Sequence, residues 1–238
     1  MTVHTTTRLS VLATLGVAVS GMFAPAAHGA FVFPDWDRPA DDTTALETRT
    51  TYQHWADFLG SPAGPNAPDA ADLNPAGTAD LFDAAHPASG SFTTSGGNIY
   101  SPSGVIEPRI VVPGFDEEDR TLVTRFQIQL RTWGQDIDTD DVLLNGDSVT
   151  DLPDLEYTEL DREAQEGGGF PADIVAHRWI FTAPFTAEAF HIDFGYGVTS
   201  SSLMEASVDT QVIPEPASLA LLGLGGLVAL TRRTRHRT

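Results

Sequence analysis

Acidic residues are the side chains in this sequence whose types and spacing most suggest chemistry. Asp136, Asp138 and Asp140 alternate like the first three ligands of a calcium-binding loop, and Asp147 falls at the twelfth position of such a loop. The sixth position holds Asp141, where that loop needs a glycine, and the residues that follow read as a strand. The spacing therefore argues against an EF-hand loop and leaves a looser Ca²⁺ site at the rim of a sheet as a hypothesis.

The remaining candidate groups do not single out a catalytic site. His191 and Asp193 share one strand face and could bind a metal, although a solvated sheet face explains them as well. Trp133 and Gln135 could offer a sugar a stacking plane and an amide, although an ordinary core role is the simpler interpretation of Trp133. Acidic residues are numerous enough to supply the two carboxylates of a glycosidase, but abundance identifies no pair. The sequence shows no G-x-S-x-G elbow, glycine-rich phosphate loop or H-E-x-x-H motif, so we expect a non-enzymatic protein.

The composition of the chain limits which partners it can bind. The 238 residues carry a net charge of −20, and all 13 basic residues are arginines. Five arginines but only one acidic residue, Glu215, lie in the end segments, which leaves residues 31–213 with a net charge of −24. Such a surface repels phosphate backbones, so we expect no nucleic-acid partner. The absence of cysteine excludes thiol catalysis, disulfides and cysteine-based zinc sites.

Period-two patterns dominate the middle of the chain and must position any site. In residues 122–133, Phe126, Ile128 and Leu130 share one predicted face, while Gln127 and Gln129 share the opposite, solvated face. Further strands are predicted within 97–101, 104–112, 141–144, 155–160, 173–183, 188–197 and 206–212, with an Asn-Gly hairpin turn at 145–146. Short strands at this spacing predict an all-β, antiparallel β-sandwich, with a jelly roll as one form of it.

Three local predictions refine this picture. Tyr52, Trp55 and Leu59 lie at helical spacing and suggest one or two amphipathic turns, and residues 61–80 read as a surface loop. Residues 163–171 read as a flexible hairpin tip. Residues 173–183 and 188–197 can pair as a hairpin, which would place Arg178 opposite Asp193 on the solvent side.

The two ends of the chain read as targeting segments. Residues 1–30 have the layout of a secretory signal peptide, with Arg8, an apolar stretch and a run of small residues. Residues 31–213 would form the exported acidic domain, and residues 214–238 a second apolar segment. Ala217–Leu230 carries no charge and would span about 21 Å as a helix, less than the ~30 Å of a bilayer core. We therefore expect a transient anchor in the inner membrane, with the arginines that follow it on the cytoplasmic side.

The C-terminal segment resembles the PEP-CTERM sorting signal. The resemblance rests on Pro214-Glu215-Pro216, a Gly- and Leu-rich apolar run, and a terminal basic cluster that contains Arg232, Arg233 and Arg235. It implies that an exosortase-type membrane protease recognises and removes the tail, in bacteria that make extracellular polysaccharide and biofilm. The prolines keep the recognition segment extended and apart from a following helix.

These observations predict an exported, non-enzymatic protein of the cell envelope or extracellular matrix. Adhesion, biofilm structure or association with extracellular polysaccharide would be its role, and no cofactor is expected beyond the hypothetical Ca²⁺. Two alternatives stay open at this point: a secreted hydrolase that acts on polysaccharide, and a calcium-dependent, lectin-like binding module. A cleft with two convergent carboxylates would favour the hydrolase, and exposed aromatic side chains on a concave face would favour the lectin.

Overall fold

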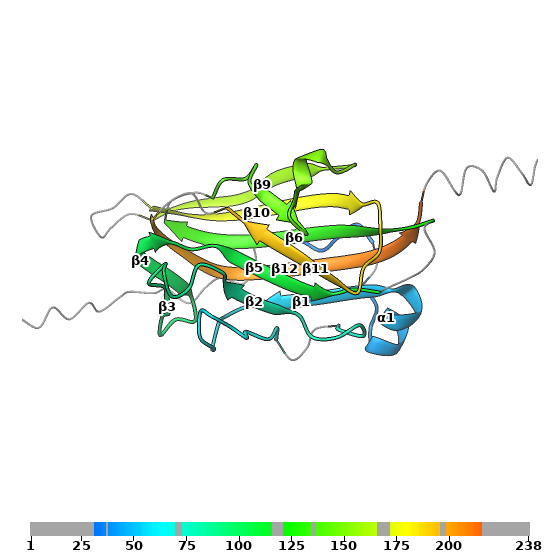
Figure 1. The fold of residues 1–238 in the computed structure, drawn as a ribbon, viewed down its shortest axis with the longest axis horizontal. Helices are drawn as coiled ribbons and strands as arrows, with labels where there is room; N and C mark the ends of the chain where they lie inside the picture. The colour runs from blue at the N-terminus through cyan, green and yellow to red at the C-terminus, as the bar shows by residue number, and fades with distance from the viewer. Residues whose placement is uncertain are drawn as a thin grey trace, which may run out of the picture.

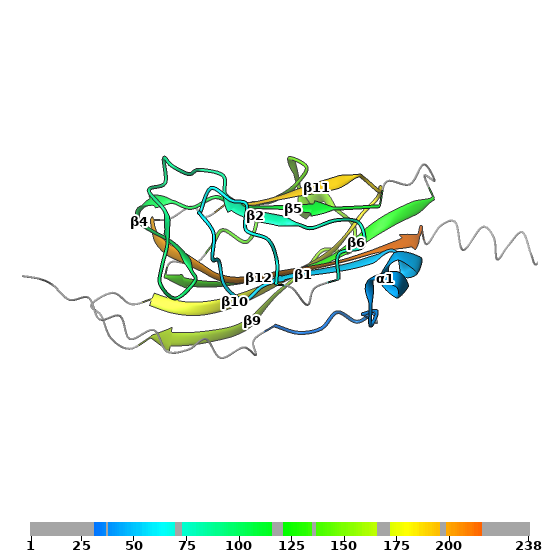
Figure 2. The ribbon, with the colours of Figure 1, turned by 90° about the horizontal axis from the view of Figure 1, so that it is seen from below.

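The computed structural model describes residues 31–36, 38–69, 73–115, 121–134, 137–165, 172–195 and 199–215. Two antiparallel sheets pack face to face in this part of the chain (Figures 1 and 2). Its helical elements are α1 (Asp42–Thr48) and the 3₁₀ turn η1 (Val149–Asp151). No helix among the described residues is long and apolar enough to cross a membrane.

Sheet A is the larger layer. Its strands follow the order β3 (Phe92–Thr93), β4 (Ile99–Val105), β12 (Thr199–Pro214), β6 (Leu122–Gly134), β10 (Ala172–Ala183) and β9 (Glu156–Gln165), and β1 (Thr50–Trp55) also pairs with β12. The long strand β12 therefore borders β4 near its start and β1 nearer its end, with β6 along its other side.

Sheet B covers one face of sheet A. Its order is β2 (Asp80–Asp83), β5 (Pro108–Pro113), β11 (Ala189–Phe194), β7 (Val142–Leu144) and β8 (Asp147–Ser148). The core between the sheets joins side chains of both layers, and Phe126 of β6 stacks on Phe181 of β10 and meets Phe190 of β11 edge-on. Burial of these large rings is the main favourable term in holding the two sheets together.

The all-β, antiparallel architecture is confirmed. β6 covers the predicted strand and places Phe126, Ile128 and Leu130 in the core. Asn145 and Gly146 join β7 to β8 with φ of 53° and 89°, the left-handed values that a type I′ hairpin turn requires. β9 and β10 pair in antiparallel fashion, and residues 163–165 of the predicted hairpin tip belong to β9, while residues 166–171 lie outside the described residues. Sheets of seven and five strands do not match the two four-stranded sheets of a jelly roll, so that refinement is not confirmed.

Two local predictions were wrong. Residues 50–55 form strand β1 instead of helical turns: Gln53 and Trp55 point to the core, while Leu59 is 88% exposed. The predicted hairpin of residues 173–183 and 188–197 does not form, because β10 belongs to sheet A and β11 to sheet B. Both strands still supply core residues, so apolar periodicity identified their inner faces but not their partners. The predicted signal peptide and the apolar sorting segment lie outside the described residues.

Candidate functional site

The outer face of sheet A, which points away from sheet B, carries the side chains that the core does not explain. On β6 this face holds Arg125, Gln127, Gln129, Arg131 and Trp133, which alternate with the core residues. The sequence predicts that the glutamines face solvent, but both are 0% exposed. Something must therefore cover the middle of this face.

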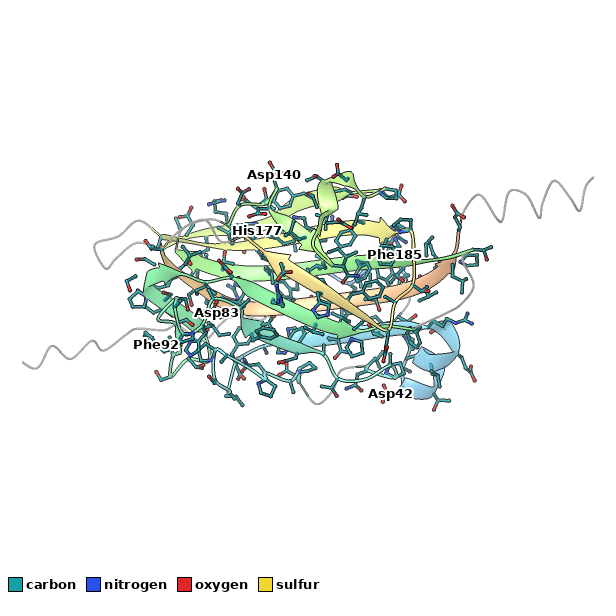
Figure 3. All side chains as sticks on the ribbon, viewed as in Figure 1. Asp42, Asp83, Phe92, Asp140, His177 and Phe185 are labelled. Atoms are coloured by element: carbon teal, nitrogen blue, oxygen red, sulfur yellow. The ribbon has the colours of Figure 1, made fainter. Side chains whose placement is uncertain are left out.

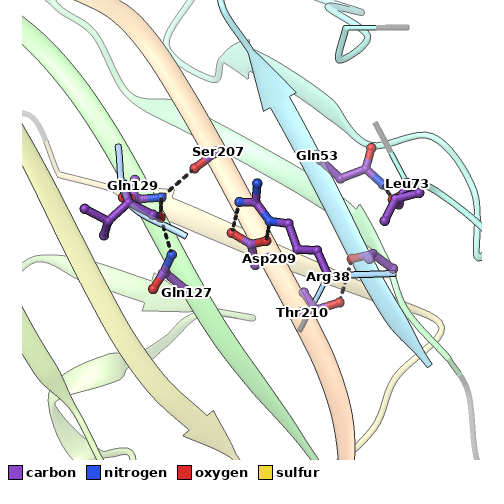
Figure 4. Close-up of polar contacts among 10 residues, drawn as sticks. Arg38, Gln53, Leu73, Gln127, Gln129, Ser207, Asp209 and Thr210 are labelled. Atoms are coloured by element: carbon purple, nitrogen blue, oxygen red, sulfur yellow. Dashed lines mark hydrogen bonds and ion pairs between the residues drawn. The ribbon is translucent and has the colours of Figure 1, made fainter. Parts of the chain in front are cut away.

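The cover is the N-terminal segment, defined here as residues 31–36 and Arg38. Figure 2 shows it running along the outer side of sheet A. The Val32 N–H donates to Gln129 Oε1 at 2.9 Å, and the Val32 carbonyl accepts from Gln127 Nε2 at 3.0 Å and Gln129 Nε2 at 3.1 Å. Gln129 Nε2 also donates to Ser207 Oγ on β12 at 3.1 Å (Figure 4). The two glutamines thus satisfy a backbone segment that no strand pairs with among the described residues.

A buried ion pair holds the far part of this segment. Arg38 Nε donates to Asp209 Oδ1 at 2.7 Å and its Nη2 donates to Oδ2 at 2.9 Å (Figure 4). The Asp209 side chain is 0% exposed, and that of Arg38 is 16% exposed. Burial raises the pKa of Asp209 to about 6, although the Arg38 guanidinium acts in the opposite direction. The carboxylate therefore depends on Arg38 for its charge balance.

Aromatic rings surround the same arginine. The Arg38 guanidinium lies 3.4 Å from the centroid of Tyr52 and 4.5 Å from that of Phe33. Nearby, Arg125 bonds Asp35 at 2.9 Å and lies 4.8 Å from the centroid of Trp36. These contacts fasten the segment at several points.

At one end of the outer face no described segment lies over the sheet, and this end carries an aromatic row, defined here as Phe92, Tyr100 and Trp133. Phe92 of β3 pairs directly with Tyr100 of β4, and Ser202 of β12 lies between Tyr100 and Trp133 of β6. The ring centroids are 5.6 Å and 6.2 Å apart, and Ser202 beneath the rings is only 1% exposed. Ile174 of β10, opposite Trp133, continues the apolar strip.

The aromatic row is accessible. Phe92 is 47% exposed and stands at the end of the molecule opposite Phe185 (Figure 3). Tyr100 and Trp133 are half-buried, so Trp133 is not the core anchor that the sequence favours. Gly134 ends the row at φ +110°, and a Cβ there would lie 2.5 Å from the Ser200 carbonyl oxygen. The close approach of β6 and β12 at this point fixes the position of Trp133.

A groove of about 790 Å³ lies at the other end of the same face. Its charged lining consists of Asp35, Arg125, Asp154, Glu156, Arg178 and Glu215, and apolar side chains such as Phe33, Ile180 and Pro184 complete it. Arg178 Nη2 donates to Glu156 Oε1 at 3.1 Å, so Arg178 pairs with Glu156 and not with Asp193 as the sequence suggests. Asp193 instead pairs with Arg109 in sheet B.

The carboxylates of the calcium hypothesis are not gathered into one group within the described residues. Asp138 and Asp140 are exposed in a turn where the Asp140 N–H donates to Asp138 Oδ1 at 3.1 Å. Asp147 starts β8 and pairs with Leu144, so the length of β7 lies between it and the turn. No three His, Asp or Glu side chains in the described ranges could hold a metal ion together. Asp136 and Gln135 lie outside the described residues, so the hypothesis stays a prediction.

His177 and His191 differ in burial, and neither lies in a cluster of metal ligands among the described residues. His177 is 0% exposed, with its Nδ1 3.0 Å from Tyr157 Oη and its Nε2 3.5 Å from Thr132 Oγ1, so it is a core residue with hydrogen-bond partners. His191 is exposed on β11, next to the Arg109–Asp193 pair.

Asp83 is another buried carboxylate, at 2% exposure. It accepts from the backbone of Ala85 and Glu107 and from the hydroxyls of Ser89 and Ser91, at distances of 2.5 to 3.0 Å. Four donors satisfy this carboxylate and tie the chain after β2 to the start of β5, so its role is structural.

Sequence reasoning missed the covering segment and two members of the aromatic row. Phe92 and Tyr100 carry no motif, and only the order of strands in sheet A places them beside Trp133. Arg38 lies 171 positions before its partner Asp209. The only available signal was a single arginine eight positions after the predicted signal peptide.

The sorting segment begins within the sheet. β12 continues to Pro214, which pairs with Leu122, and the Glu215 N–H donates to the Thr121 carbonyl oxygen at 2.6 Å. Pro216 and the arginines at positions 232, 233 and 235 lie outside the described residues.

Comparisons with known proteins identify this segment alone. Residues 212–235 match the family described as the PEP-CTERM protein-sorting motif. No curated protein and no solved structure matches the chain. The match confirms the resemblance on which the C-terminal prediction rests, and with it export and transient anchoring at the C-terminus. The chain therefore carries a PEP-CTERM sorting signal and is an exported protein that an exosortase system sorts.

Proposed function

We propose that this exported protein is a non-enzymatic component of the cell envelope or extracellular matrix that binds polysaccharide through its aromatic row. The observation that carries the proposal is the line of Phe92, Tyr100 and Trp133 on an open sheet face. Aromatic rings pack against the apolar C–H faces of sugars, and the polar tips of Tyr and Trp add hydrogen bonds. Rings spread over three strands suit a linear polymer more than a single sugar.

Charge selects the class of polysaccharide. Residues 31–213 carry a net charge of −24, and this field repels polyanions at moderate ionic strength. The proposed ligand is therefore a neutral polysaccharide. Adhesion or biofilm structure follows from such binding at the cell surface or in the matrix.

A glycan array tests the proposal. The protein should bind neutral glycans, and Trp133→Ala should weaken binding by a factor of up to about ten, because an aromatic contact contributes roughly 0.5 to 1.5 kcal/mol. Phe185→Ala is the matched control, because Phe185 is an exposed phenylalanine at the opposite end of the molecule. Equal losses in both variants, or binding confined to acidic glycans, would refute the proposal.

The groove favours a second candidate function, hydrolysis of polysaccharide. Asp154 and Glu156 both line it, and two carboxylates on either side of a glycosidic bond are the usual catalytic pair. Against this, Glu156 is paired with Arg178 and Asp35 with Arg125. Two of the four carboxylates that line the groove are therefore already engaged by arginine partners.

A hydrolysis screen separates the two candidates. The protein should release no reducing ends from the glycans that it binds. Release that disappears in both Asp154→Asn and Glu156→Gln would establish the groove as a catalytic site and overturn the non-enzymatic proposal.

A further inference from the structure

The position at which β12 leaves the domain limits the orientation of the protein on the membrane while its tail is anchored. Pro214 is still paired with Leu122 of β6, and Glu215 is hydrogen-bonded to Thr121. The apolar run begins at Ala217, with only Pro216 between. Two residues span at most about 7 Å, so the start of the apolar run stays within about 7 Å of Glu215.

The apolar run is too short to leave free chain between the domain and the membrane. Ala217–Leu230 would span about 21 Å as a helix, against ~30 Å for the hydrocarbon core, and an arginine cluster follows it directly. A segment shorter than the hydrocarbon core is accommodated by local thinning of the bilayer or by snorkelling of flanking residues, and neither leaves free chain between the segment and the domain. The end of the sheet at Glu215 must then lie at the membrane surface.

Two exposed apolar side chains flank this exit. The Val212 N–H donates to the carbonyl of Arg49, which caps α1, and Leu46 of that helix is 56% exposed. On the other side, Thr124 Oγ1 donates to the carbonyl of Phe185, whose side chain is 38% exposed. Figure 1 shows α1 and the β10–β11 connection at the end where β12 leaves, with β3 and β4 at the opposite end.

We propose that, while the sorting tail is anchored, the sandwich stands on the lipid bilayer by this end, with Leu46 and Phe185 at the headgroups. The aromatic row then faces away from the membrane. From Leu122 to Trp133 β6 rises 11 residues at ~3.3 Å each, so the row stands roughly 35 Å farther out. This orientation does not depend on what the row binds.

Charge opposes lasting contact with lipid at the same end. Asp42 and Glu47 on α1 are exposed close to Leu46, and acidic side chains are repelled by an anionic leaflet. The anchored C-terminal segment, and not the affinity of this surface for lipid, therefore keeps the domain at the membrane. Removal of the tail would release it.

Fluorescence quenching in vesicles tests the orientation. The chain has no cysteine, so Leu46→Cys, Phe185→Cys and Phe92→Cys each give one labelling site. The full chain, with its tail intact, is reconstituted into vesicles whose lipid headgroups carry a contact quencher. Labels at positions 46 and 185 should be quenched several-fold more strongly than a label at position 92. Equal quenching at both ends, or no association of the full chain with vesicles, overturns the proposal.

A linker variant tests the cause. Insertion of about ten Gly and Ser residues between Glu215 and Pro216 gives the domain freedom to leave the surface. Quenching at position 185 should then fall to the level at position 92. Undiminished quenching would mean that this end binds lipid by itself and would overturn the anchored segment as the cause.

Discussion

Two parts of the outer face of sheet A are built from the same strands but differ in what lies over them. In the middle, Gln127, Gln129 and Asp209 are fully buried beneath the N-terminal segment, which accepts hydrogen bonds from the amides of both glutamines and pairs with the carboxylate. At the β3 end, the rings of Tyr100 and Trp133 lie over Ser202, and no described segment covers them. In the first part, polar side chains that point outward bind the covering segment and stabilise the fold. In the second part, aromatic side chains point outward and remain accessible.

This contrast separates stability from binding. Removal of the partner of a buried polar group greatly lowers the free energy of unfolding, whereas truncation of an exposed ring lowers it little. Substitutions in the covered part should therefore lower the free energy of unfolding without changing glycan affinity, and those in the aromatic row should do the reverse.

The largest effect is expected from Arg38→Ala. It leaves Asp209 as a buried carboxylate without its partner, so the free energy of unfolding should fall by about 3 to 5 kcal/mol. Urea unfolding measures this change. Arg162→Ala is the control, because Arg162 pairs with Glu159 and Asp173 at more than a third exposure and should cost less than about 1 kcal/mol. Similar losses in both variants would mean that the covering segment contributes little to stability.

Asp209 should also make stability depend on pH. Its pKa is about 6 when folded against a usual value of 3.8, so the folded state binds the proton more tightly. Its contribution is therefore greatest below pH 4 and is lost as the pH rises to about 6, a change of about 3 kcal/mol. The difference in unfolding free energy between the wild type and Asp209→Asn isolates this group. A difference that stays flat from pH 4 to 7 would contradict the raised pKa.

The sequence predicted the inner face of this sheet much better than the outer one. Phe126, Ile128 and Leu130 were placed correctly, because apolar alternation follows directly from burial between two sheets. Gln127 and Gln129 have the same polar alternation whether water or another segment lies over them. Val32, which bonds both glutamines, lies 95 positions before Gln127 and 97 before Gln129, and only tertiary structure brings it there.

The partners of strands were equally hard to predict. Residues 173–183 and 188–197 match as a hairpin in apolar pattern, yet the connection between them crosses from one sheet to the other. Periodicity identifies which side of a strand is buried but not which sheet it joins. The members of the aromatic row come from β3, β4 and β6, so sequence reasoning found Trp133 and could not connect it with Phe92 and Tyr100.

Two single variants, one in the covered part and one in the aromatic row, test the separation of stability from binding with smaller expected effects. Gln129→Leu removes the acceptor of the Val32 N–H and should cost about 1 to 3 kcal/mol of unfolding free energy with unchanged glycan affinity. Phe92→Ala, at the most exposed ring of the row, should change the unfolding free energy by less than about 1 kcal/mol and weaken binding severalfold. Parallel measurements of thermal unfolding and glycan affinity decide the matter. If both variants lose both properties, the two parts of the face are not separate.

The calcium hypothesis predicts the smallest effect, and it bears on the aromatic row because Asp136 follows Trp133 by three positions. Carboxylates crowded on a domain of charge −24 repel one another, and a bound Ca²⁺ would relieve that repulsion. A weak site at tenfold excess of calcium over its Kd adds about 1.4 kcal/mol, which should raise the melting temperature by a few degrees. The Asp138→Asn/Asp140→Asn double variant should lose this shift. An equal shift in that variant, or with sodium at matched ionic strength, would show general screening of an acidic surface. A different outcome is that glycan binding disappears both on chelation of calcium and in the double variant. The turn and the aromatic row would then form one calcium-dependent site, and binding by the rings alone would be contradicted.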